Sequence, residues 1–88
     1  MEIIFILGSK LAQLLKINEA QAIGVITLAI KDGNKKMNAL SYDDCREVIQ
    51  TYLKARLAKM NTANIDAVIK DMLKVLSEKQ SLFVMMAR

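Results

Sequence analysis

Few residues in this chain of 88 could perform chemistry. The sequence contains no histidine and one cysteine, Cys45, which excludes a disulfide within the chain, the usual metal clusters and histidine-based catalysis. Asp43, Asp44 and Glu47 lie close together in the sequence, but the first two would point in different directions on a helix, and acidic residues at a helix start usually interact with its dipole. Cys45 falls on the apolar side of the same helix, so its thiol should stay protonated and inert. We therefore predict a protein that is not an enzyme and that uses no cofactor and no metal ion.

Residues 32–44, DGNKKMNALSYDD, carry oxygen-bearing side chains at intervals. The residues with the spacing of a calcium-binding loop are Asp32 and Asn34 at its start and Leu40, Ser41, Tyr42 and Asp44 at its end. Through them the segment resembles a degenerate EF-hand loop. Calcium requires oxygen ligands at alternating positions, a glycine at the bend and a bidentate glutamate at the end. Lys35 and Lys36 stand where ligands are needed and no glycine lies in the middle of the loop, so a capped helix start explains the segment better than a calcium site.

Residues 11–30, LAQLLKINEAQAIGVITLAI, begin as an amphipathic helix, break at residues 17–18 and continue as a helix that is apolar on nearly every side. The residues that follow a recurrent pattern are Leu11, Ala12, Leu14, Leu15, Ile17, Ala22, Gly24 and Ile26. Through them the segment resembles the helix-turn-helix opening of phage and plasmid replication-organiser proteins. The resemblance implies that residues 18–31 form a recognition helix whose N-terminal side chains contact base edges while basic neighbours bind phosphates. The nucleic-acid-binding residues would then be Asn18, Gln21, Lys31, Lys54, Arg56 and Lys59.

The charge of the chain permits nucleic-acid binding without requiring it. Thirteen lysine and arginine residues against nine aspartate and glutamate residues give a net charge of +4 and an isoelectric point near 9.4, but the excess is not gathered into one run. Glu19, at the start of the implied recognition helix, would repel the phosphate backbone that supplies most of the affinity. We therefore favour the alternative, in which residues 11–30 are two core helices joined by a tight turn.

Apolar spacing predicts one all-α domain over residues 1–88, a small four-helix bundle. The expected helices are 3–16, 19–31, 42–60 and 63–85, the second of them central and the third and fourth packed as an antiparallel hairpin. No proline interrupts them. Asn18 is a suitable N-cap, and Ser41 with Asp44 comes close to a capping box. The apolar runs 3–7 and 82–86 would also suit paired strands, but we favour helix.

Two details of these helices concern packing and boundaries. In the second helix Ala20 and Gly24 lie one turn apart, and they should let another helix approach closely. The fourth helix should begin at a cap supplied by Asn61 or Thr62.

The composition is strongly aliphatic. Hydrophobic residues make up 53% of the chain, yet it has only two phenylalanines, two tyrosines and no tryptophan. A chain of this length buries only about 60–65% of the surface that its unfolded form exposes, so the excess favours self-association, with a tightly packed monomer as the alternative. A dimer contact or another protein partner would use the apolar chain ends, which are Ile3, Ile4, Leu82, Phe83, Val84, Met85 and Met86.

The opening run MEIIFILGSK raises the question of a targeting or membrane segment. It lacks a basic start and is far shorter than the roughly 20 residues that span a bilayer, so we expect it to belong to the fold, with no membrane span. A lone cysteine favours a cytoplasmic setting. The sequence thus predicts a non-enzymatic helical protein-interaction module that forms a homo-oligomer through an aliphatic and Met-rich surface. The alternative is a small helix-turn-helix-like nucleic-acid-binding regulator of phage or plasmid type.

Overall fold

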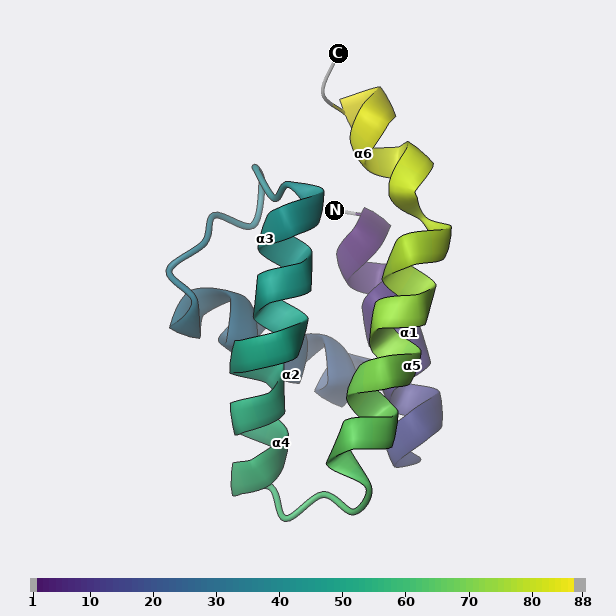
Figure 1. The fold of residues 1–88 in the computed structure, drawn as a ribbon. Coiled ribbons are helices and arrows are strands. Elements are labelled where there is room, and N and C mark those ends of the chain that lie inside the picture. The colour runs from purple at the N-terminus through teal and green to yellow at the C-terminus, as the bar shows by residue number, and fades with distance from the viewer. Residues whose placement is uncertain (1, 87–88) are drawn as a thin grey trace.

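The computed structural model describes residues 2–86, with side chains for residues 2–83, and it is all-α as predicted (Figure 1). Its helices are α1 (Glu2–Leu15), α2 (Glu19–Asp32), α3 (Tyr42–Glu47), η1 (Val48–Leu53), α4 (Lys54–Lys59), α5 (Ile65–Glu78) and α6 (Gln80–Met86). α3, η1 and α4 form one continuous helix over residues 42–59, in which η1 is a π-helical stretch. The runs 3–7 and 82–86 are helical, and no strand occurs between residues 2 and 86.

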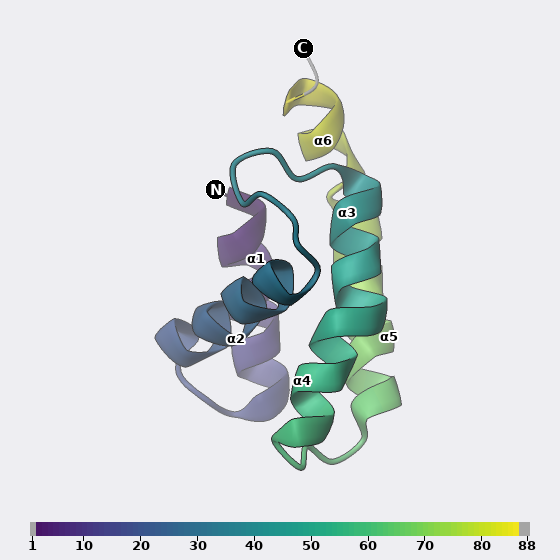
Figure 2. The ribbon, with the colours of Figure 1, turned by 90° about the vertical axis from the view of Figure 1, so that its left-hand side faces the viewer.

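Three helices of the bundle run along a common direction and α2 crosses them (Figures 1 and 2). The helix of residues 42–59 and α5 are antiparallel neighbours, as predicted for the third and fourth helices. α1 packs against α5, and α2 lies across α1 and η1. The predicted helix 63–85 is divided at Lys79 into α5 and α6. Residues 77–81 are all polar, so no apolar side chain between Leu76 and Leu82 holds a continued helix against the bundle.

The helix starts at residues 18 and 41 are fixed by side-chain caps. The Asn18 side chain accepts a hydrogen bond from the Gln21 N–H, and the Gln21 side chain accepts one from the Asn18 N–H. Ser41 and Asp44 exchange the same two bonds at 3.0 and 3.1 Å. Each pair satisfies backbone donors that the first turn of a helix leaves free. Both predicted caps are therefore confirmed.

Three helices end at a residue with positive φ that is not glycine. Lys16, Asn34 and Asn61 have φ values of 57°, 60° and 56°. The next N–H donates to the carbonyl five residues earlier in each case, at 3.1 Å, in the pairs Ile17 to Ala12, Lys35 to Ile30 and Thr62 to Leu57. This bond is the hallmark of the Schellman C-cap. Asn61 thus ends a helix, and the prediction that Asn61 or Thr62 caps the following one is wrong, because α5 begins after Asn64.

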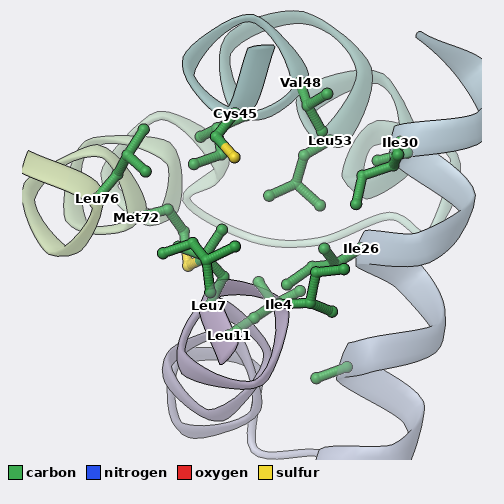
Figure 3. Close-up of a cluster of buried hydrophobic side chains, with 14 of the residues drawn as sticks. Ile4, Leu7, Leu11, Ile26, Ile30, Cys45, Val48, Leu53, Met72 and Leu76 are labelled. Atoms are coloured by element: carbon green, nitrogen blue, oxygen red, sulfur yellow. The ribbon is translucent and has the colours of Figure 1, made fainter. Parts of the chain in front are cut away.

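The core consists of aliphatic and sulfur-containing side chains. Figure 3 shows Ile4, Leu7 and Leu11 of α1, Ile26 and Ile30 of α2, Cys45, Val48 and Leu53 of the helix 42–59, and Met72 and Leu76 of α5. Within residues 2–83 no polar or charged residue is buried. An interior gap of about 10 Å³ among these side chains has barely the size of one water molecule. The core is therefore closely packed and leaves no space for a ligand at that point.

α2 lies on the outside of the bundle and is not central as predicted. A Cβ atom on Gly8 of α1 would lie 2.5 Å from Cγ1 of Ile23, so the two helices meet closely at that glycine. Ala20 and Gly24, which were expected to make such a contact, are exposed, and a Cβ on Gly24 would have no neighbour within 4 Å. The reason is geometric: these two positions lie on the side of α2 opposite to buried Ala22.

Candidate functional site

The cysteine thiol of the chain lies inside the bundle. Cys45 is 3% exposed and forms part of the core. Burial, with a smaller effect from the charge of Asp44, raises the pKa of this thiol to about 11. The thiol therefore stays protonated at neutral pH, as the sequence predicted.

The carboxylates of the EF-hand-like segment are engaged in structural contacts. Asp32 accepts two hydrogen bonds from Arg56, at 2.6 and 2.9 Å, and this arginine lowers the pKa of Asp32. Asp44 takes part in the capping box. The hydrogen bond from the Ser41 N–H lowers the pKa of Asp44 most, and Lys35 lowers it further. No group of three or more potential metal-binding side chains occurs among the described residues. The oxygens of residues 32–44 thus serve the ends of two helices.

Several of the residues proposed for nucleic-acid binding are engaged in structural contacts. The Oδ1 atom of Asn18 is occupied by the Gln21 N–H at 2.7 Å, which removes one of the two groups that an asparagine needs to pair with adenine. Lys54 lies 3.3 Å from Asp66, and Arg56 is held by Asp32. Of the set, Lys31 and Lys59 are exposed and form no ion pair within residues 2–83.

The residues proposed for partner binding at the chain ends have mixed positions. Ile3 and Ile4 are 1% and 3% exposed, so they belong to the core and the expectation of an N-terminal contact surface at these residues is wrong. Leu82 and Phe83 are half-buried, and the Phe83 ring packs edge-on against Tyr42 with ring centres 5.6 Å apart. The side chains of Val84, Met85 and Met86 lie outside the described residues.

A different apolar surface is exposed where α2 meets the end of α4. It is an open groove of about 640 Å³, lined by Ile17, Gln21, Gly24, Val25, Thr27, Leu28 and Met60, and we call it the α2 groove. Leu28 is 43% exposed and Met60 45%. Gly24 contributes no side chain, and the Thr27 hydroxyl donates to the Ile23 carbonyl at 2.8 Å. The exposed surface that lines the groove is mainly apolar, although Gln21 belongs to it.

Three basic residues lie close to the residues that line the α2 groove. Lys16 precedes Ile17, Lys59 precedes Met60, and Lys31 lies two helical turns beyond Gly24 on the same side of α2. We call these three residues the lysine rim. All three are exposed and make no ion pair within residues 2–83. The nearby Asp32 is paired with Arg56, and the charge of Lys59 also contributes to the lowered pKa of Asp32.

The apolar character of the second helix is the feature of the sequence that corresponds to the α2 groove. A helix that is apolar on nearly every side was expected to be central. The structure shows another solution, in which one face of α2 packs in the core and the opposite face, with Gly24 and Leu28, stays exposed. Met60 is far away in sequence, and no spacing rule connects it with α2.

The comparisons with protein-family models, curated proteins and solved structures found no match. The resemblances of residues 11–30 and 32–44 to replication-organiser proteins and to EF-hands therefore stay predictions. Among the described residues, no helix has the length and apolar character needed to cross a membrane.

Proposed function

We propose that this protein is a non-enzymatic interaction module that docks another protein through the α2 groove. The observation that carries the proposal is the exposure of Leu28 and Met60, which line one apolar groove together with Gly24. Scattered exposed apolar residues are normal, whereas neighbouring ones in a hollow are typical of an interaction site. Covering the exposed part of each side chain would contribute about 1 kcal/mol to docking.

Two other large apolar residues are exposed, but they lie outside the α2 groove. Phe5 and Met37 are 59% and 36% exposed, but neither lines the α2 groove. Met37 lies in the connection between α2 and α3. It therefore offers a control of the same chemistry as Met60 outside the proposed site.

The proposal is tested with a helical probe that carries no charge. A capped peptide of about 15 residues, with leucine at i, i+3, i+4 and i+7 spacing and glutamine or alanine elsewhere, is titrated into the ¹⁵N-labelled protein. We expect the resonances of Gly24, Val25, Leu28 and Met60 to shift. Leu28→Gln and Met60→Gln should each weaken binding severalfold, and Met37→Gln should leave it unchanged. Shifts spread over other helices, or equal binding by all three variants, would refute docking at the groove.

Nucleic-acid binding is the second candidate, and one observation favours it. α1 and α2 are joined by three residues and α2 crosses α1 (Figure 2). A short turn between crossing helices is also a feature of helix-turn-helix proteins, and this likeness supports the candidate. Retention on duplex DNA that falls steeply with salt and is lost in the variant with Lys31→Ala and Lys59→Ala would support this function. No retention at low salt would exclude it.

A further inference from the structure

The chemistry of the docked partner follows from the charge and shape of the α2 groove, and this inference rests on the proposed function. We propose that the groove binds an amphipathic helix of another protein that has a leucine-like apolar stripe and acidic residues beside it. The apolar stripe would lie on Gly24, Leu28 and Met60. The acidic side chains would pair with the lysine rim.

The shape of the groove suits a helix. Its residues on α2 run from Gln21 to Leu28, which corresponds to about 10 Å of helix length, or two turns, and Ile17 lies just before the helix. Gly24 lies in its middle, and the 4 Å around a Cβ at this position are empty, so the backbone of a second helix can approach α2 closely. Side chains at i, i+3 or i+4, and i+7 of such a helix would reach Leu28, Met60 and Ile17.

The charge of the groove favours an acidic partner. Some basic side chains elsewhere on the surface have acidic partners: Lys35 lies 3.4 Å from Asp44 and 3.1 Å from Glu47, and Lys54 lies 3.3 Å from Asp66. The three lysines of the rim form no ion pair within residues 2–83, although the charge of Lys59 contributes to the lowered pKa of Asp32. Glu19 is the nearest unpaired acid in sequence, but it lies five residues from Gly24 and thus about 140° away around the helix axis. Three lysines without an ion pair therefore stand next to residues of the groove or on the same side of α2.

A second copy of the chain fits the groove poorly for the same reason. Pairing two α2 grooves face to face would bring six lysines of two rims together, and like charges across an interface disfavour the contact. Nucleic acid would satisfy the lysines but would leave Leu28 and Met60 against a charged backbone. An acidic amphipathic helix is the partner that satisfies both the apolar floor and the rim.

The inference is tested with three peptides that differ only in charge. The glutamine peptide described above is compared with versions that carry glutamate or lysine at the positions flanking the leucine stripe. At about 50 mM NaCl we expect the glutamate peptide to bind about tenfold more tightly than the glutamine peptide, and the lysine peptide to bind more weakly than both. At about 500 mM NaCl the differences should largely vanish.

Two triple variants with the same loss of charge provide the control. K16Q/K31Q/K59Q removes the lysine rim, and K70Q/K74Q/K79Q removes three exposed lysines that also lack ion pairs within residues 2–83. Only the first should abolish the advantage of the glutamate peptide. Circular dichroism confirms that both variants fold.

The possible outcomes separate the inference from the proposed function. Equal binding of the glutamate and glutamine peptides at the groove, or equal effects of both triple variants, overturns the acidic-partner inference and leaves the docking groove in place. Binding of none of the peptides at the groove overturns both. A dimer in light scattering that Leu28→Gln dissociates would make a second copy the occupant. Duplex DNA that shifts the rim resonances while no peptide does would favour nucleic acid.

Discussion

The inner and outer faces of α2 both carry apolar residues, but the two faces have opposite environments. On the inner face Ala22, Ile26, Ala29 and Ile30 are at most 3% exposed. On the outer face Ala20, Gly24 and Leu28 are exposed. The two faces differ mainly in which one meets α1 and the helix of residues 42–59. A helix that is apolar all round can therefore indicate a second contact that the isolated chain leaves open, and not only a central position.

The largest difference between the faces should appear when one large side chain is removed from each. Ile26→Ala leaves a hole in a closely packed core and should lower the free energy of unfolding by about 2–5 kcal/mol. Leu28→Ala removes an exposed side chain and should change it by less than about 0.5 kcal/mol. Urea unfolding followed by circular dichroism measures both. A large loss for Leu28→Ala would mean that the outer face is packed within the monomer.

Two glycines extend the comparison to the backbone. A Cβ on Gly8 would meet Cγ1 of Ile23 at 2.5 Å, well inside contact distance. Gly8→Ala should therefore push α1 and α2 apart and destabilise the protein by about 1–2 kcal/mol, even though alanine is the better helix former. Ile23→Ala in the same chain should recover part of the loss by making room for the new methyl group. An unchanged midpoint in Gly8→Ala would show that the helices do not meet there.

Gly24→Ala should stabilise the protein, in contrast to Gly8→Ala. Nothing lies within 4 Å of a Cβ at Gly24, so the substitution brings only the helix propensity of alanine and should stabilise the protein by up to about 1 kcal/mol. Thermal unfolding of the two alanine variants under one condition gives the contrast directly. If both variants were destabilised, the outer face of α2 would not be free.

The sequence predicted the inner face and the helix ends better than the outer face. Helices with specific caps, at Asn18 and Ser41, were placed within one residue, because a polar side chain at a helix start has a local cause that is visible in the sequence. The division at Lys79 was missed, because it results from the lack of core contacts over residues 77–81 and no glycine or proline marks it. The α2 groove was missed because tertiary packing alone decides which apolar face of α2 is covered and brings Met60 beside it.

A smaller effect on stability is expected when Lys16, in the turn that leads into α2, is replaced. Its φ of 57° is costly for lysine, and the chain uses asparagine at the two equivalent C-caps, Asn34 and Asn61. Lys16→Asn should stabilise the protein by about 0.5 kcal/mol, because asparagine adopts this conformation more readily. Asn61→Lys is the reverse control and should destabilise it by a similar amount. Chemical unfolding of both variants measures the pair, and two changes of the same sign would contradict the assignment of the turns.

The smallest change in stability is expected when the ion pair that joins the two sides of the groove is removed. Asp32 ends α2 and Arg56 belongs to α4, so their two hydrogen bonds hold Leu28 and Met60 at a fixed separation. Arg56 lowers the pKa of Asp32 in the folded protein. The stabilisation by this pair is therefore complete above the ordinary aspartate pKa of about 4 and is lost as the pH falls through the lowered folded-state value. The difference in thermal midpoint between the wild type and Asp32→Asn should be constant from about pH 5 to pH 7 and should shrink toward zero below about pH 4. A difference that grew on acidification would mean that Asp32 is held protonated and that the pair does not connect α2 with α4.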